Sequence, residues 1–304
     1  MAEITAQMVK ELREKTNAGM MDCKKALSAT NGEFEAAVNW LREKGLAAVA
    51  KKAGRVAAEG LVGVASEASV AAMVEVNCET DFVAKNPEFQ QFVADLAKAV
   101  IAGKPADVDA FLAQKLGGST VKDSLTEKIA KIGENMTIRR FARAEGALGT
   151  YIHMGGNIGV IVELDVADAG KNGNESVKML ARDVAMQVAA GSPLWLKKED
   201  ADQKILDNEK SIALEKAKAD GKPEKILDKI AEGAVKKFLD ENCLLDQAFI
   251  KDDKLTVQKH VEKVAKELGT TISVKAMHRF KVGEGIEKKA DDFAAEVAKM
   301  AGTG

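Results

Sequence analysis

The chain has 304 residues, of which 46% are hydrophobic and 30% are charged, and its formal net charge is −2. This balance is typical of a globular protein of about two domains of ~150 residues, and it gives no electrostatic reason to expect binding to nucleic acid or an anionic membrane. No apolar run approaches the ~20 residues that a membrane-spanning helix needs.

Residues 1–54 predict a compact bundle of three short helices. Thr5 is placed to cap the first helix and Asp22 the second, with Met20 and Met21 at the turn between them. The third helix is marked by an apolar stripe of Phe34, Val38, Leu41 and Leu46. We expect this segment to be a separate N-terminal domain.

Residues 55–140 predict a first α+β subdomain. Two strands over 61–64 and 70–76 form a hairpin, and an amphipathic helix follows that ends at Gly103. Its apolar stripe consists of Phe89, Phe92, Val93, Leu96, Ala97 and Val100. The hairpin predicts an antiparallel sheet with one helix packed on it.

Residues 141–282 predict a second, related subdomain. Strands over 149–153 and 158–164 precede a helix that ends at Gly191, and a further strand covers 272–282. When residues 74–105 are compared with 162–193, without a gap, nine of 32 positions are identical. Background composition would give about two, so the sequence indicates a duplicated unit.

Two further segments complete the predicted α+β architecture. Residues 199–241 are highly charged and break once, at 220–223, which predicts an antiparallel coiled-coil hairpin inserted in the second subdomain. Its predicted apolar seam consists of Ile205, Ile212, Ala213, Ile226, Ile230, Ala234 and Phe238. Residues 283–304 form a C-terminal module in which Asp291 or Asp292 caps a last helix.

The sequence contains no motif of a nucleotide-binding or metal-dependent enzyme. It has no GxxxxGK[ST] loop, no complete GxGxxG fingerprint, no HExxH and no CxxC pair, and its three histidines are far apart. We therefore expect no catalytic residues, no cofactor and no bound metal. The start of the chain lacks the apolar segment of a signal peptide, and three scattered cysteines suit a reducing compartment, so we expect a cytoplasmic protein.

The stretch Thr80-Asp81-Phe82-Val83 follows a predicted strand and sets an aromatic residue beside an acidic one. Phe82 is open to interpretation as a core residue, and Asp81 as a helix cap or turn former. The second copy of the duplicated unit has Ala169 and Gly170 at the equivalent positions. The acidic–aromatic pair is therefore not needed to build the unit, which favours a functional role.

Four stretches, taken together, resemble bacterial translation elongation factor Ts. They are MAEITAQMVKELREKTNAGMMDCKKAL at 1–27, EVNCETDFVAKN at 75–86, KIGENMTIRR at 131–140 and GEGIEKKADDFAAEVAKM at 283–300. They occur in the family's order over nearly the whole chain. The resemblance implies a ubiquitin-associated-like N-terminal domain at 1–54, and it implies guanine nucleotide exchange on the GTPase elongation factor Tu.

The resemblance also implies roles for individual residues. Thr80, Asp81, Phe82 and Val83 match the family's signature loop, which enters the GTPase domain of Tu and disturbs its magnesium site. Contacts with Tu are further implied for a second set of residues: Lys10, Arg13, Met20, Met21 and His153. A homodimer within the complex with Tu, and the role of residues 199–241, are left open.

Two other functions remain as alternatives at this point. The chain could be an interaction scaffold whose helical N-terminal module binds another partner, with residues 80–83 serving a structural role. It could also be an enzyme, if the fold gathered His153 and Cys78 with a carboxylate in one pocket. Replacement of Asp81 and Phe82 discriminates between exchange factor and scaffold.

Overall fold

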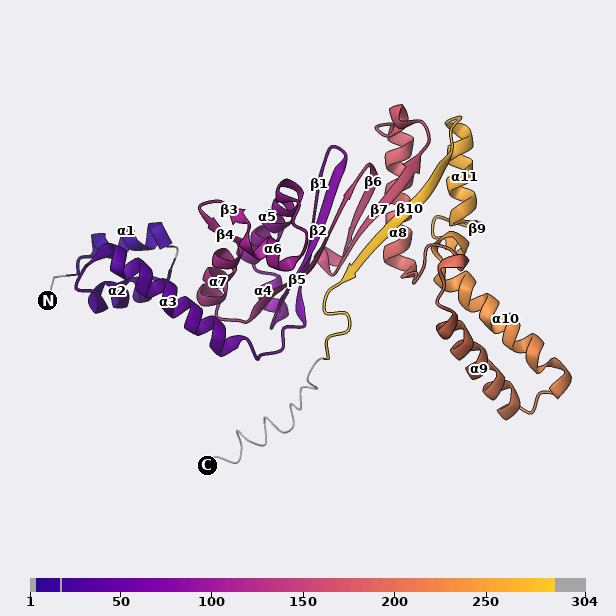
Figure 1. Cartoon of the computed structure of the whole chain (residues 1–304), viewed down its shortest axis with the longest axis horizontal. Helices are drawn as coiled ribbons and strands as arrows, with labels where there is room; N and C mark the ends of the chain where they lie inside the picture. The colour runs from indigo at the N-terminus through magenta and orange to yellow at the C-terminus, as the bar shows by residue number, and fades with distance from the viewer. Residues whose placement is uncertain (1–3, 17, 288–304) are drawn as a thin grey trace.

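The computed structural model describes residues 4–16 and 18–287 and has an elongated shape (Figure 1). A group of helices lies at one end, two antiparallel sheets lie in the middle, and a long helical hairpin projects from the other end. This mixture of helices and antiparallel sheets confirms the predicted α+β class.

The N-terminal helices are α1 (Ala6–Thr16), α2 (Met20–Ala29) and α3 (Phe34–Lys52). Thr5 caps α1 as predicted, because its Oγ1 accepts a hydrogen bond of 3.2 Å from the amide of Met8. The predicted cap at Asp22 is wrong. Gly19 is the N-cap of α2, so Asp22 lies inside the first turn, where a carboxylate interacts favourably with the helix dipole. A small core holds the bundle: Val9, Leu12, Cys23, Ala26, Leu27 and Ala37.

Two three-stranded antiparallel sheets form the centre of the molecule. The first contains β1 (Glu59–Glu67), β2 (Val70–Cys78) and β5 (Met136–Glu145), in the order β1-β2-β5. The second contains β6 (Ala147–His153), β7 (Ile158–Val166) and β10 (Ile272–Lys281), in the order β10-β7-β6. The sheets share a small apolar cluster: Val62, Ala71, Met73, Ala144 and Ile161.

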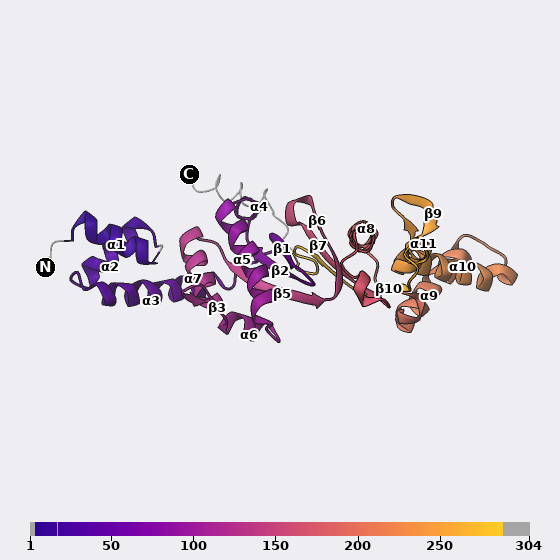
Figure 2. The same ribbon diagram turned by 90° about the horizontal axis from the view of Figure 1, so that it is seen from above.

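One long helix covers the outer face of each sheet. Helix α5 (Pro87–Gly103) packs on the first sheet and α8 (Glu175–Gly191) on the second, so that Figure 2 shows the strands between the two helices. Both helices end at the predicted glycines. Every residue of the predicted α5 stripe is buried, and each helix contributes its apolar side to a separate core.

The duplication seen in the sequence extends to the element boundaries. Strands β2 and β7, and helices α5 and α8, begin and end at positions that differ by 88 residues. Both helices begin with an asparagine cap, Asn86 or Asn174, and both sheets have a β-bulge in the last strand. The extra residue of the bulge is Arg139 in β5 and Lys275 in β10. The two copies therefore share backbone irregularities as well as regular structure.

The segments between these elements contain further structure that the sequence analysis did not predict. The first copy includes α6 (Val108–Ala113), β3 (Lys115–Leu116), β4 (Ser119–Thr120) and α7 (Val121–Ile132). The second includes β8 (Ala248–Phe249), β9 (Asp252–Thr256) and α11 (Val257–Glu267). Helix α7 packs against α3 of the N-terminal bundle. At this contact, Arg42 of α3 forms an ion pair of 3.1 Å with Asp123 of α7.

The projecting hairpin consists of α9 (Gln203–Ala219) and α10 (Glu224–Asn242). Three isoleucines of the predicted seam, Ile205, Ile212 and Ile226, are instead exposed. The most buried hairpin residues are Ala217, Leu227 and Ala231, whereas the other four residues of the predicted seam are half-buried: Ala213, Ile230, Ala234 and Phe238. The predicted C-terminal helix beginning at Asp291 or Asp292 lies outside the described residues.

Candidate functional site

Residues 80–83 form one helical turn at the end of β2. Two residues separate β2 from helix α4 (Asp81–Ala84). The second of them, Thr80, is the N-cap of α4 and accepts a hydrogen bond of 3.4 Å from the amide of Val83. Val83 and Ala84 are buried in the core of the first copy. Phe82 is 81% exposed, which excludes the interpretation of this residue as part of the core. Asp81 is the first residue of the turn rather than its cap.

The carboxylate of Glu134 holds the start of this turn from a neighbouring segment. It accepts a hydrogen bond of 2.6 Å from the Thr80 hydroxyl, and two more from the backbone amides of Thr80 and Glu79, at 3.0 and 3.1 Å. Hydrogen bonds to an ionised acceptor are among the stronger ones in proteins. Three donors therefore fix the backbone immediately before Asp81 and Phe82.

Glu79 makes the reciprocal contact with the segment that precedes β5. Its carboxylate accepts a hydrogen bond of 2.5 Å from the amide of Asn135, and the Asn135 side chain donates to the carbonyl of Arg55 at 2.8 Å. Each of the two neighbouring turns thus supplies a glutamate that binds amides of the other. These reciprocal hydrogen bonds fix the position of α4 relative to the first sheet.

Cys78 lies directly beneath the turn. Its thiol is buried and donates a hydrogen bond of 3.2 Å to the carbonyl of Thr80. Burial, together with the nearby Glu134 carboxylate, raises the pKa of this thiol to about 12. The thiol therefore stays protonated near neutral pH and does not provide a nucleophile.

The side chain of Asp81 faces solvent and pairs with a lysine one turn later. Its carboxylate accepts a hydrogen bond of 2.6 Å from Lys85 Nζ. This hydrogen bond is the main reason that the pKa of Asp81 is lowered from its ordinary value. The turn thus presents an ionised carboxylate beside an exposed aromatic ring. In the second copy, the position equivalent to Phe82 is occupied by Gly170, which belongs to the 3₁₀ turn Ala169–Lys171.

Several of the residues predicted to contact a partner gather at the N-terminal helices. Lys10, Arg13 and Met20 line one hollow, and Lys131 of α7 also lines it. Met20 and the neighbouring Met21 are both exposed. Exposed, flexible methionines are common at binding surfaces. Met21 does not line the hollow, although it belongs to the same first turn of α2.

His153 is apart from this group, at the last position of β6. Its Nδ1 lies 3.3 Å from the Tyr151 hydroxyl, and the exposed Met154 follows it. The strand ends there in the short turn Met154–Gly156. A Cβ atom at Gly156 in this turn would contact Leu61 of β1, which lies two residues from Glu59, the partner of Cys78 at the end of β2. His153 and α4 therefore lie toward the same edge of the two sheets.

Glu134 and Lys131 contribute to the site although neither was predicted to do so. Both belong to the stretch KIGENMTIRR at 131–140, which carries part of the family resemblance. A hydrogen bond across 54 residues of sequence depends on how β2 and β5 pair. Local patterns do not contain that information.

The described part of the chain contains neither a cluster of metal-binding side chains nor a membrane-spanning helix. Within residues 4–16 and 18–287, no group of three or more histidine, cysteine or acidic side chains could hold a metal ion. No helix in these ranges is long and apolar enough to cross a membrane.

Comparison with known proteins identifies the family. The family described as "Elongation factor TS" matches residues 79–284. The chain is 50% identical over 303 residues to an elongation factor Ts of Syntrophotalea carbinolica, with 98% of this chain and 99% of the relative covered. It is 52% identical over 305 residues to one of Clostridium perfringens, with the same coverage. The chain therefore belongs to the elongation factor Ts family.

Proposed function

We propose that this chain is the guanine nucleotide exchange factor of the GTPase elongation factor Tu in translation elongation. The observation that carries this proposal is the 81% exposure of Phe82 on a turn whose backbone is fixed from two sides. An exposed aromatic ring contributes free energy to association when a partner buries it. Its position in the family's signature loop makes the GTPase domain of Tu the proposed partner.

Phe82 acts in this proposal as a rigid wedge. The ring gains free energy when it enters an apolar gap between helices of the partner, and that gain offsets the cost of separating them. The wedge has to be held in place to transmit force. Glu134 from one side, and the buried Val83 from the other, supply that support.

Asp81 acts beside the wedge on the magnesium site of the partner. Magnesium requires near-ideal octahedral coordination at ~2.0–2.1 Å, so a small displacement of its surroundings weakens the binding of Mg²⁺–GDP. The carboxylate of Asp81 is ionised and solvent-facing, as competition for the ligands or waters of a metal requires. Because binding free energies are linked, the exchange factor lowers the affinity of Tu for GDP by the same factor as GDP lowers the affinity of Tu for the exchange factor.

The remaining modules extend the contact in this proposal. Lys10, Arg13, Met20 and Met21 on the N-terminal helices, and His153 at the end of β6, bind further parts of Tu. We assign residues 1–54, 55–140, 141–282 and 283–304 as the N-terminal domain, two core subdomains and C-terminal module. Exchange of this kind needs no covalent or proton-transfer step, so the chain is not an enzyme in the usual sense.

The proposal is tested by the release of a fluorescent GDP analogue from Tu in a stopped-flow instrument. The chain is added together with an excess of unlabelled GDP, and the release rate is recorded against the concentration of the chain. We expect release to accelerate by orders of magnitude over the spontaneous rate. Binding to Tu without acceleration would reject the exchange function and favour the scaffold.

A further inference from the structure

One face of strand β2 lies between the two sheets and changes from apolar to polar along the strand. Ala71 and Met73 belong to the apolar cluster that the sheets share. Glu75 and Asn77 continue the same face, because alternate residues of a strand point to the same side. Glu75 has no solvent exposure, and Asn77 is 1% exposed. A charge buried this deeply is tolerated only when charges and donors surround it.

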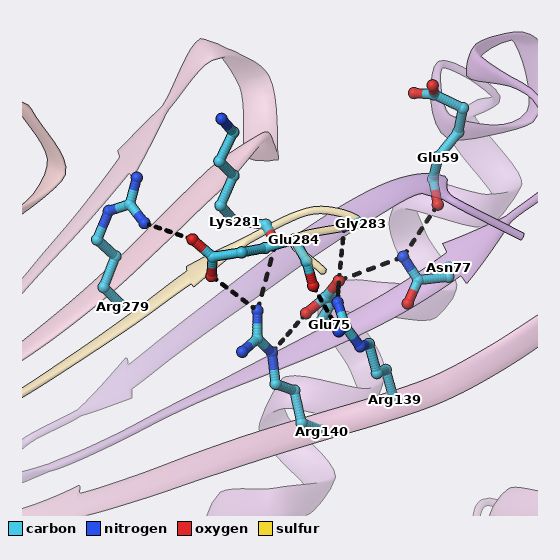
Figure 3. A network of polar contacts seen from close by, with 9 residues as sticks. All are labelled: Glu59, Glu75, Asn77, Arg139, Arg140, Arg279, Lys281, Gly283 and Glu284. Carbon is cyan, nitrogen blue, oxygen red and sulfur yellow. Dashed lines mark hydrogen bonds and ion pairs between the residues drawn. The ribbon is translucent and has the colours of Figure 1, made fainter. Parts of the chain in front are cut away.

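Four donors surround the carboxylate of Glu75 (Figure 3). Two are arginines of β5, namely Arg139 Nη1 at 3.1 Å and Arg140 Nε at 2.6 Å. The third is Asn77 Nδ2 at 3.2 Å, and the fourth is the backbone amide of Gly283 at 2.9 Å. The first three belong to the first sheet, whereas Gly283 follows the last strand of the second sheet. The buried carboxylate therefore joins the two copies.

The two arginines extend this junction to the end of β10. Arg140 Nη2 donates to the carbonyl of Lys281 at 3.3 Å, and its guanidinium carbon lies 4.3 Å from the centre of the Phe280 ring. Arg139 Nη2 donates to the carbonyl of Glu284 at 2.6 Å. Arginine suits this role, because one planar guanidinium both stacks on a ring and donates several hydrogen bonds in fixed directions. The end of the second sheet is thus held by side chains of the first.

The segment held in this way lies between the two turns that carry predicted contact residues. On one side, the amide of Val282 donates to the carbonyl of Asn157 at 2.9 Å, and Asn157 directly follows the short turn after His153. On the other side, Gly283 has a φ of +68°, and a Cβ atom there would collide with the carbonyl oxygen of Ala58. Ala58 precedes β1, whose first residue pairs with the last residue of β2, before α4.

The second copy provides an internal comparison. Glu163 is equivalent to Glu75, and its carboxylate lies 3.2 Å from Lys275 Nζ and 3.2 Å from His278 Nε2. Both partners belong to β10, the strand beside Glu163 in the same sheet. These two contacts therefore stay within one copy, whereas the contacts of Glu75 cross from one copy to the other.

We propose that Glu75 is a positioning residue for nucleotide exchange: its buried carboxylate fixes the spacing between the Phe82 turn of the first copy and the His153 turn of the second. Both turns then bind one GTPase molecule at the same time. This inference rests on the proposed exchange function and adds a residue that does not contact the partner.

The physical reason is that two contacts on one rigid frame act as linked binding sites. Once the first contact has formed, the second forms at a high effective concentration only if the spacing of the two matches that of the partner. The apolar cluster between the sheets favours their contact without fixing a direction. Hydrogen bonds from guanidinium groups to a carboxylate are strong and directional. The network around Glu75 therefore supplies what the apolar cluster lacks.

Glu75→Gln tests the junction, and Glu163→Gln is the matched control in the second copy. Glutamine keeps the shape of the side chain, but it removes the charge and turns one acceptor oxygen into a donor. Amide hydrogen exchange of the free protein reports on the junction, because the amide of Gly283 donates to Glu75. We expect this amide to exchange about tenfold faster in Glu75→Gln, since a hydrogen bond to a charged acceptor is the stronger one, and at the wild-type rate in Glu163→Gln.

The GDP-release assay then tests whether the junction serves exchange. In Glu75→Gln we expect the half-saturating concentration of the chain to rise about tenfold, while the maximal release rate stays within about twofold of the wild type. Glu163→Gln should match the wild type in both. If Glu75→Gln fails to fold by circular dichroism, Arg140→Lys replaces it. That variant keeps a cation beside Glu75 and loses the hydrogen bond to the carbonyl of Lys281, so the same changes are expected.

A double-mutant cycle with His153→Ala separates positioning from general destabilisation. If Glu75 acts by placing the His153 turn, its replacement matters only while His153 makes its contact. We therefore expect Glu75→Gln to raise the half-saturating concentration by at most about twofold in the His153→Ala background, against about tenfold in the wild-type background. A role in stability alone would change both backgrounds by the same factor.

Three results would overturn the proposal. Unchanged amide exchange at Gly283 in Glu75→Gln would show that the carboxylate does not hold the two copies together. Equal effects of Glu75→Gln in the two backgrounds, or an unchanged half-saturating concentration in His153→Ala alone, would show that the spacing of the two turns is not what Glu75 provides. Failure of the wild-type chain to release GDP would instead reject the proposed function, and with it the role in exchange, while the amide measurement would still decide the junction.

Discussion

Thr80 and Glu134 are joined by two hydrogen bonds, one from the Thr80 hydroxyl at 2.6 Å and one from its backbone amide at 3.0 Å. The two residues are 54 positions apart, and they meet because β2 and β5 are adjacent antiparallel strands. The hydroxyl that caps α4 is the same one that binds Glu134. The turn carrying Phe82 is therefore supported by Glu134, from the segment that precedes β5, as well as by its own cap.

Glu134→Ala should destabilise the fold and slow exchange. It leaves two backbone amides and a hydroxyl without their acceptor, so we expect the free energy of unfolding to fall by about 1–3 kcal/mol. The looser turn should lower the maximal rate of GDP release several-fold, and Glu134→Gln should fall between this variant and the wild type. Urea unfolding and the release assay measure the two effects. The control Glu232→Ala alters an exposed glutamate of the projecting hairpin. Equal stability of Glu134→Ala and this control would refute the supporting role.

The stability of the second copy should depend on the charge of His260. This ring stacks on Phe249 with centroids 4.2 Å apart, and Asp183 and Lys251 lie nearby. Burial is the main cause of the lowered pKa of His260; Asp183 and Glu267 oppose it, whereas Lys263 and Lys251 reinforce it. The neutral ring is thus favoured in the folded state.

The sign of the resulting pH dependence follows from linkage. When the folded-state pKa lies below the unfolded value of 6.5, the unfolded chain binds more protons in the interval between the two. The contribution of His260 is therefore fully present above pH 6.5 and is lost as the pH falls through the folded-state pKa. We expect the melting temperature to decrease less between about pH 7.5 and about pH 5.5 in His260→Gln than in the wild type. An equal decrease in both proteins would contradict this account, and the exposed His153→Gln provides the control.

The three cysteines should be unreactive in the folded protein. Cys23, Cys78 and Cys243 are all buried, and the pKa is raised to about 12 for Cys78 and about 11 for Cys243, mainly by burial. Because the thiolate is the reactive form, a thiol reagent near pH 8 should label none of the three until the chain unfolds. Rapid labelling of Cys78 in native conditions would show that the turn above it opens readily.

Periodicity predicted the parts of the fold whose burial is regular. The stripe along α5 marks one apolar face, and β2 is an almost continuous apolar run that is buried on both faces. The second copy shows the same kinds of pattern in its strand β7 and its helix α8. The elements between residues 104 and 135 were missed. There, short helices and two-residue strands bury isolated side chains, such as Phe111 and Val121, which give no recurring pattern.

The hairpin shows a different limit of sequence reasoning. Its existence and its turn were predicted, but only part of its predicted seam is covered: Ile205, Ile212 and Ile226 are exposed, whereas Ile230 and Phe238 are half-buried. The site shows the same limit. The sequence identified Phe82 through the contrast with Gly170, whereas the role of Glu134 depends on the pairing of β2 with β5 and is not contained in local patterns.

Phe82→Ala should leave stability unchanged and remove most of the exchange activity. The ring is 81% exposed and contributes little to the core, so we expect the free energy of unfolding to change by less than about 0.5 kcal/mol. A central aromatic contact of an interface is often worth 2 kcal/mol or more, so the maximal rate of GDP release should fall by at least about 30-fold. We expect Asp81→Ala to fold as well and also to reduce the maximal rate of GDP release.

The most direct test of the account compares Phe82→Ala with Met179→Ala in the stopped-flow GDP-release assay. Met179 is a similarly exposed apolar side chain on α8, so its removal controls for the loss of surface hydrophobicity. The account predicts that the maximal release rate falls at least about 30-fold in Phe82→Ala and stays at the wild-type value in Met179→Ala. Equal maximal rates for Phe82→Ala and the wild type, with both proteins folded, would contradict the role of Phe82 as the wedge.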